Sequence, residues 1–217
     1  MFIGHFGTAF AAKKIAPQPS LGTLILAAQF IDLLWPVLLL LGIEKVAIDP
    51  GNTAVTPLDF YHYPISHSLL GVLGWGVLLG LVYYLIKKNW KNSLVLGALV
   101  LSHWLLDLLT HRPDLPLIPG LDVKVGLGLW NSLLGTLLVE LAIFVGGVYL
   151  YLKMTRARNN KGKYAAWGLI FFLVLVYSSN IFGAAPPGVE PIAYVGLLQW
   201  LLVLWGYWID RNREVKT

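Results

Sequence analysis

Long apolar runs separated by short polar segments dominate this chain. Each run is close to the roughly 20 residues that a helix needs to cross the ~30 Å hydrocarbon core of a membrane. The pattern therefore predicts an all-α fold, a polytopic membrane bundle of about six transmembrane helices. The six runs are residues 21–43, 65–86, 94–109, 127–152, 165–182 and 192–209.

The first apolar segment, residues 1–12, is too short to span a membrane. As a helix it would reach about 18 Å into the bilayer, because a helix rises about 1.5 Å per residue. Lys13 and Lys14 follow this segment rather than precede it, which is the reverse of a secretory signal. We expect a retained N-terminal half-helix that rises from Lys13.

The composition excludes an ordinary soluble domain, since 57% of the residues are hydrophobic, 12% are charged and the mean hydropathy is +0.70. There is no cysteine, so a transition-metal site must be built from carboxylates and the five histidines. The formal charge of +5 is explained by membrane topology, and we expect no nucleic-acid partner.

The basic residues divide the loops into two groups. Thirteen of the sixteen Lys and Arg residues fall on one side of the predicted membrane, and by the positive-inside rule that side is cytoplasmic. We therefore expect an integral protein of the cytoplasmic (inner) membrane, with its C-terminus inside and the loops of His62 and Arg112 outside. The thirteen are Lys13, Lys14, Lys87, Lys88, Lys91, Lys153, Arg156, Arg158, Lys161, Lys163, Arg211, Arg213 and Lys216.

Ionisable side chains interrupt the apolar runs at one depth. His103, Asp107 and His111 recur at i, i+4 and i+8, so on a helix they share one face and can close on a metal ion. Counted from the cytoplasmic basic residues, Asp32, His103 and Glu140 all lie roughly 18–20 Å in. A carboxylate at the bilayer centre costs about 2.5–3.5 kcal/mol on insertion scales, so this coincidence predicts a polar site, open outward.

Two prolines bear on where the site residues lie. Pro36 removes the hydrogen bond that the Asp32 carbonyl would accept, so we expect a kink at this carboxylate. Pro64 suits the first position of the next helix, which would place His67 in its first turns and His62 just before it.

Two questions stay open. Glu140 is either a metal ligand, a neighbour of one, or a helix contact that carries a proton. His111, Arg112 and Asp114 form either the mouth of the site or a solvated loop.

Short sequence strings in the first half of the chain resemble the YdjM-like family of membrane proteins, which are assigned as metal-dependent hydrolases. The resemblance covers residues 1–120. That family is similar in turn to the zinc-dependent phospholipase C and single-strand nuclease superfamily. The strings are Gly4-His5, Asp32, His62-Tyr-Pro-Ile-Ser-His67-Ser68 and Ser102-His103-Trp-Leu-Leu-Asp107-Leu-Leu-Thr110.

The resemblance implies a set of zinc ligands in which Asp107 bridges two ions. The chain departs from the family at Leu33–Trp35, where an acidic residue and a histidine are common, and at Tyr63-Pro64, where Arg-Gly is common. We therefore expect one or two Zn²⁺ ions rather than three. The implied ligands are His5, Asp32, His62 or His67, His103 and Asp107.

The leading hypothesis for function is a zinc hydrolase that acts on a lipid or lipid-linked phosphoester from the outer leaflet. Asp32 or Asp107 would accept a proton, and Arg112 would hold a phosphate oxygen. The alternatives are an ion- or proton-coupled transporter and a metal-binding membrane protein without turnover.

We expect a single membrane-embedded domain over residues 1–217, with the metal site in 1–120 and mainly scaffold helices in 121–217.

The distribution of basic residues makes a prediction about topology. Reporters fused after Thr217 or inserted in the 153–163 loop should report a cytoplasmic location, and a reporter near Thr53 should report the outside. Reversed signals in this fusion assay would contradict a site that opens outward.

Overall fold

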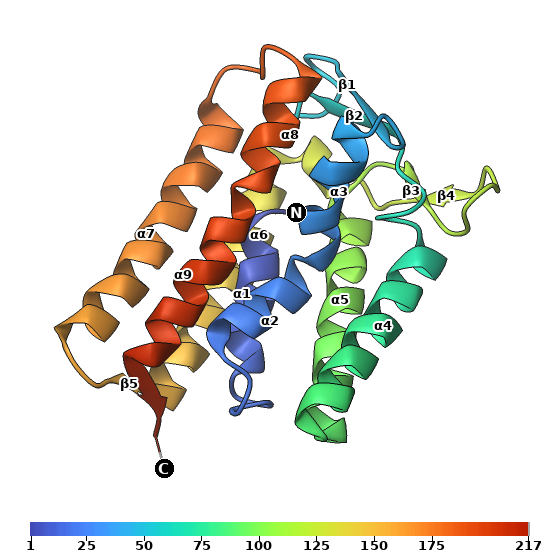
Figure 1. Cartoon of the computed structure of the whole chain (residues 1–217). Helices are drawn as coiled ribbons and strands as arrows, with labels where there is room; N and C mark the ends of the chain where they lie inside the picture. The colour runs from blue at the N-terminus through green and yellow to red at the C-terminus, as the bar shows by residue number, and fades with distance from the viewer. Residues whose placement is uncertain (217) are drawn as a thin grey trace.

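The computed structural model describes residues 1–216 and is a bundle of α-helices (Figure 1). It confirms the predicted all-α membrane fold. Within the described part of the chain, five spans are long and apolar enough to cross a membrane, and a bent helix pair makes up to six. The five are α4 (Leu69–Lys87), α5 (Trp90–Thr110), α6 (Leu133–Met154), α7 (Asn160–Phe182), and α8 (Val189–Leu197) continued by α9 (Gln199–Arg211).

The four longest helices begin at serine or asparagine caps. In α4 the Ser68 hydroxyl accepts a hydrogen bond from the backbone N–H of Gly71, which satisfies one donor of the open first turn. Asn89, Ser132 and Asn159 do the same for α5, α6 and α7. Because α4 begins at Leu69, the prediction that it starts at Pro64 is wrong, and His67 lies in the turn before the helix.

The first predicted span is broken. It consists of α2 (Leu21–Ala28) and α3 (Phe30–Leu40), which meet at an angle of 56°. Gln29 between them leaves the helical region, with φ −102° and ψ 8°, whereas Pro36 lies inside α3. The kink that we predicted at Asp32 is therefore wrong in position: the bend lies three residues earlier, at Gln29. At Pro36 the helix loses only one hydrogen bond and continues.

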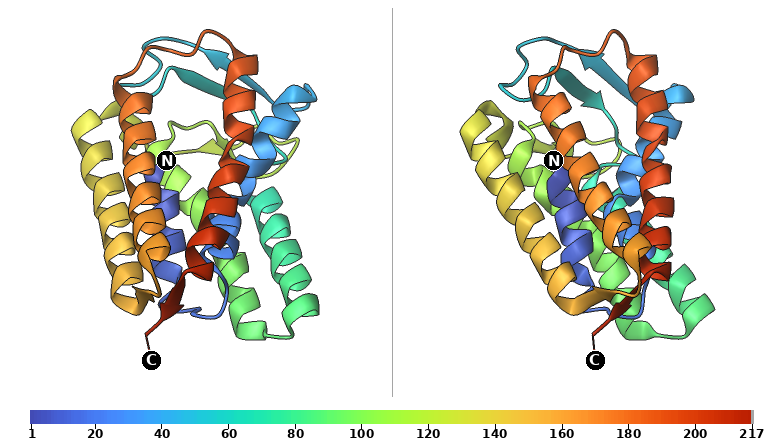
Figure 2. Two further views of the ribbon diagram at one scale, coloured as in Figure 1. Left: turned by 60° about the vertical axis from the view of Figure 1, so that its left-hand side comes forward. Right: turned by 90° about the vertical axis from the view of Figure 1, so that its left-hand side faces the viewer.

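The N-terminal half-helix is present as α1 (Ile3–Ala12), and it lies inside the bundle rather than at its edge. Figures 1 and 2 show the N-terminus about halfway along the bundle, surrounded by longer helices. Ile3, Phe6 and Ala9 are fully buried. A helix of this length can therefore carry its first residues to the middle of the membrane.

A carboxylate from α6 caps the buried start of α1. One Glu140 side-chain oxygen accepts hydrogen bonds from the backbone N–H groups of Phe2 (2.8 Å) and Gly4 (3.2 Å). The first turn of a helix has no partners of its own for these donors, and its dipole favours a negative charge there. Of the three interpretations of Glu140, the structure supports a helix contact, and this contact caps the start of α1.

Short antiparallel strand pairs lie at both ends of the bundle. At one end β1 (Lys45–Ile48) pairs with β2 (Leu58–His62), and β3 (Leu115–Pro116) pairs with β4 (Lys124–Val125), followed by the 3₁₀ turn η1 (Leu129–Asn131). At the other end β5 (Thr155–Ala157) pairs with β6 (Arg213–Val215). The loop between residues 44 and 63, which we predicted to lie outside the membrane, thus contains a hairpin.

The basic segments of the sequence share one end of the bundle. Lys13 Nζ lies 2.6 Å from Asp210 Oδ2, Asn89 Nδ2 lies 2.6 Å from Gln18 Oε1, and Arg156 Nε lies 2.7 Å from Glu214 Oε1. These contacts join the 13–20 segment, the α4–α5 turn, β5 and the C-terminal segment. The segments that the charge pattern assigned to one side therefore do lie together.

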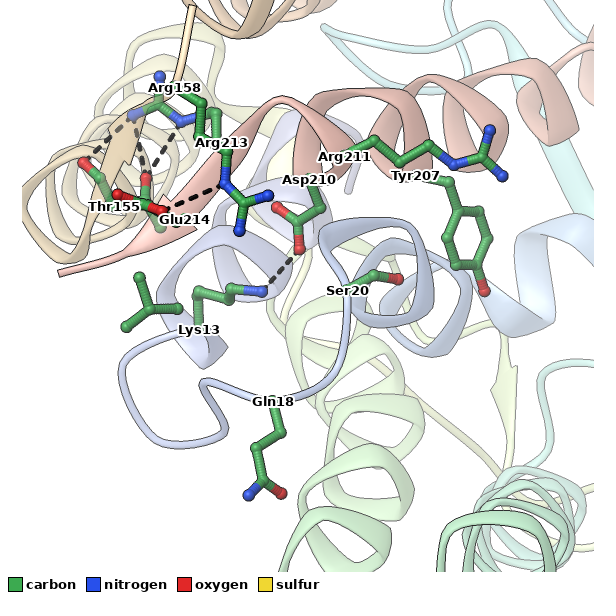
Figure 3. Close-up of a pocket in the computed structure, with 11 residues that line it drawn as sticks. Lys13, Gln18, Ser20, Thr155, Arg158, Tyr207, Asp210, Arg211, Arg213 and Glu214 are labelled. Atoms are coloured by element: carbon green, nitrogen blue, oxygen red, sulfur yellow. Dashed lines mark hydrogen bonds and ion pairs between the residues drawn. The ribbon is translucent and has the colours of Figure 1, made fainter. Parts of the chain in front are cut away.

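A polar cavity of about 370 Å³ opens at this basic end (Figure 3). Three of its four cationic side chains have partners: Lys13 pairs with Asp210, Arg158 pairs with Glu214, and Arg213 donates to Thr155. Burial of Arg213 against Thr155 also ties the C-terminal strand to the end of α6. The cavity is best explained as the junction that holds the helix ends together.

Two glycines let α1 approach α6 closely. A methyl group at Gly147 would lie 2.0 Å from the Gly7 carbonyl oxygen, whereas one at Gly146 would have no atom within 4 Å. We expect Gly147→Ala to force the helices apart and to destabilise the protein by about 1–3 kcal/mol, measured as a lower thermal midpoint in detergent. Gly146→Ala is the matched control, and an equal loss in both variants would contradict this packing.

Candidate metal centre

Side chains from three segments meet at the inner end of α1. Asp32 comes from α3, His67 from the turn before α4, and His103 and Asp107 from successive turns of α5. His67, His103 and Asp107 are almost fully buried, and the side chain of Asp32 is 23% exposed. The cluster therefore reaches the molecular surface through Asp32.

The spacing of their ligand atoms fits one small metal ion. His67 Nε2 lies 3.4 Å from Asp32 Oδ1 and 3.9 Å from Asp107 Oδ2, and His103 Nε2 lies 3.5 Å from Asp32 Oδ2 and 3.3 Å from Asp107 Oδ2. Four ligands at 2.0–2.2 Å from a tetrahedral Zn²⁺ would be about 3.3–3.6 Å apart. Three of the four separations, at 3.3–3.5 Å, match the edges of such a tetrahedron, and the fourth is longer at 3.9 Å; the two contacts of Asp32 use different oxygens of its carboxylate.

The orientation of His103 provides a further test of this fit. Its Nδ1 lies 2.6 Å from the carbonyl oxygen of Ala28, and a carbonyl can only accept, so Nδ1 carries the proton. In the neutral ring Nε2 then presents a lone pair to two carboxylates, and within the described residues it has no hydrogen-bond partner. A cation between these groups removes the repulsion, and the donor set of imidazoles and carboxylates suits zinc.

The bend in the first span explains the contact between His103 and the backbone. Ala28 is the last residue of α2, where helix carbonyls lack partners within the helix. Sequence reasoning missed Ala28, because no side-chain pattern marks a backbone oxygen as an acceptor. The available signal was Pro36, which predicted an irregularity in this span but not its position.

His5 supports the same cluster from α1. Its ring stacks on that of His103, with centroids 3.4 Å apart and planes 9° apart, and its Nε2 lies 3.1 Å from Asp107 Oδ1. The Met1 nitrogen lies 2.6 Å from the same oxygen. The two oxygens of Asp107 thus face different groups: Oδ1 faces α1, and Oδ2 faces His67 and His103.

A second group of candidate ligands follows from this arrangement. The ligand atoms of His5, His103 and Asp107 all lie within 4.8 Å of one another, as do those of Asp32, His67 and His103. The structure thus brings together five of the six predicted ligands. The sixth, His62, lies at the exposed end of β2, paired with Lys45, and belongs to neither group.

The residues after α5 form a separate buried network. His111 Nδ1 lies 2.8 Å from Asp114 Oδ1, and the Tyr63 hydroxyl donates to the same oxygen at 2.9 Å. Burial lowers the pKa of His111, and burial together with the Asp114 charge raises the pKa of Tyr63 well above its usual value. Of the two interpretations for His111 and Asp114, a solvated loop is wrong, because both side chains are buried.

Arg112 is held by two acidic residues at the edge of this network. Its guanidinium forms an ion pair with Asp59 on β2 and lies 3.4 Å from Asp114 Oδ2. The side chain is 36% exposed. These ion pairs fix the loop after α5 against the β1–β2 hairpin.

The geometry predicts which substitutions remove metal. His67→Ala, His103→Ala and Asp107→Ala each delete a ligand atom and should abolish or sharply lower bound zinc, measured by elemental analysis of the purified protein. His62→Ala and Asn131→Ala lie outside the cluster and should leave it unchanged. Equal zinc content in all five variants would contradict a metal site in this cluster.

Comparisons with known proteins place the chain in a family. A sequence model of the family described as YdjM inner membrane protein matches residues 3–185, which include every residue of the cluster. Searches of curated proteins and of solved structures gave no significant match. Because the match covers most of the chain, and the structure has the apolar spans of an integral membrane protein, the chain belongs to the YdjM inner membrane protein family.

Proposed function

We propose that this protein is a zinc-dependent hydrolase of the inner membrane that cleaves a lipid-linked phosphoester. The observation that carries the proposal is the convergence of Asp32, His67, His103 and Asp107, whose imidazole nitrogens and carboxylate oxygens lie 3.3–3.9 Å apart in the four contacts given above. The resemblance to metal-dependent phosphoesterases adds the reaction class. Zinc held there by His67, His103 and Asp107 would leave one position for a water beside Asp32, and it would activate that water at neutral pH and polarise a phosphoryl oxygen.

The residues around the zinc ion would have different roles in the reaction. Asp107 and His103 are buried and rigidly placed on α5, so their role is to hold the ion. Asp32 is the one member of the four whose side chain is substantially exposed, and we assign it the uptake of the proton that water releases. His5 keeps Asp107 oriented through its 3.1 Å contact. The ion pairs of Arg112 leave it without an assigned role in the reaction.

The packing around the cluster supports entry from the side opposite the basic end. Between the cluster and the basic end, the bundle is filled by Phe6, Phe10, Leu24 and Leu96, each no more than 1% exposed. Toward the other end lies the polar network of His111 and Asp114. A substrate anchored in the outer leaflet would meet polar groups on that side, and a transporter would need a second polar path.

The test is hydrolysis by the purified full chain in detergent, with phospholipids and polyprenyl phosphates as substrates. We expect release of the head group or of phosphate, which a chelator abolishes and added Zn²⁺ restores. Asp107→Asn should lose activity by several orders of magnitude, because it removes a charged ligand. Asp122→Asn, in an exposed loop, is the matched control and should retain activity.

Transport is the alternative outcome. Proteoliposomes loaded with the same protein should show no proton-coupled or divalent-metal flux. Flux that depends on Asp32 or Glu140, together with no hydrolysis of any substrate in the panel, would overturn the proposal in favour of a transporter.

A further inference from the structure

A carboxylate outside the cluster contacts one of its histidines through a serine. Glu44, the residue before β1, is 1% exposed, although it stands at the start of a loop that the sequence places outside the membrane. Its Oε1 accepts hydrogen bonds from the backbone N–H groups of Ile65 and Ser66, both at 2.8 Å. Its Oε2 lies 2.5 Å from Ser66 Oγ, and Ser66 Oγ lies 2.6 Å from His67 Nδ1.

The direction of these hydrogen bonds follows from the donors available. A carboxylate can only accept, so the single proton of the Ser66 hydroxyl points to Glu44. Ser66 Oγ must then accept from His67, which puts the ring proton on Nδ1. In the neutral ring Nε2 is left with a lone pair, 3.4 Å from Asp32 Oδ1.

We propose that Glu44 and Ser66 are positioning residues that lock His67 in the Nδ1–H tautomer, so that its Nε2 is available to bind a metal ion. This inference rests on the proposed zinc site. It gives His67 the same tautomer as His103, whose Nδ1 donates to the Ala28 carbonyl, although the two acceptors come from different parts of the fold. Outer partners of this kind fix the ring orientation and raise the basicity of a ligating histidine.

Glu44→Gln tests the proposal with little change in shape. The backbone N–H groups of Ile65 and Ser66 only donate, so the glutamine oxygen should stay in the position of Oε1. The amide nitrogen then takes the position of Oε2 and donates to Ser66 Oγ. Ser66 must turn its own proton toward His67 Nδ1, which moves the ring proton to Nε2 and blocks the metal-binding atom.

Two measurements on the full-length protein in detergent detect this change of tautomer. In metal-free samples with ¹⁵N-labelled histidine, the ring nitrogen shifts should show Nδ1–H for His67 in the wild type and Nε2–H in Glu44→Gln. His67→Gln identifies the signals among the five histidines. In titrations with Zn²⁺ alone, Glu44→Gln should weaken affinity by about 10- to 100-fold.

Serine variants separate positioning from folding. Ser66→Ala removes the link between Glu44 and His67 and should also weaken zinc binding. Adding Glu44→Gln to Ser66→Ala should cause little further loss of affinity, because the hydroxyl proton that Glu44→Gln turns toward His67 is already absent. Ser68→Ala removes the cap of α4. The Ser68 hydroxyl accepts from Gly71 and not from the His67 ring, so this variant should lower thermal stability but leave the His67 tautomer unchanged.

An unchanged His67 tautomer in Glu44→Gln would overturn the inference, as would losses that add fully in the double variant. These outcomes are distinct from failure of the proposed function. If the wild type binds no zinc, the hydrolase proposal fails, whereas the tautomer of His67 in metal-free protein still decides whether Glu44 and Ser66 set it.

Discussion

The contact between imidazole nitrogens and carboxylates in the middle of the bundle is the constraint on which the rest of this structure depends. Asp107 is 2% exposed, and His103 is 1% exposed, in a protein whose surroundings are lipid. A buried carboxylate is costly unless it is paired or bound to a cation. The surrounding segments therefore have to supply polar partners for the cluster. This requirement accounts for the irregularities of the backbone beside it.

Three breaks in regular helix lie beside the cluster: the start of α1, the bend at Gln29 and the turn before α4. Backbone groups at membrane depth must be satisfied by the protein, because lipid offers no hydrogen bonds. Here Glu140 caps α1, His103 donates to the carbonyl of Ala28, and Glu44 accepts from the turn that holds His67. At each break, backbone groups lack partners within a helix, and they bond instead to side chains. These contacts orient a cluster residue or the helix that carries it.

The two ends of the bundle differ in chemistry as well as in charge. The basic end is tied by ion pairs such as Lys13 with Asp210, and the interior next to it is apolar. The opposite end carries the buried network of Tyr63, His111 and Asp114. The polar side chains that adjoin the cluster therefore lie on the side away from the basic end.

Much of the fold was determined by the sequence, because crossing lipid requires long apolar helices and the basic residues sort the loops. The i, i+4 spacing of His103 and Asp107 likewise determined that they share a helix face. The half-helix was predictable from the position of Lys13. Each of these rests on local order along the chain, which sequence patterns record directly.

The tertiary structure alone decided the partners. It placed His67 rather than His62 in the cluster, put the bend at Gln29 instead of Asp32, and made Glu140 the cap of α1. It also brought Glu44 to Ser66, 22 residues away along the chain. The physical reason is that these choices depend on which donors and acceptors meet across helices, and no spacing within a single helix or loop encodes such a meeting.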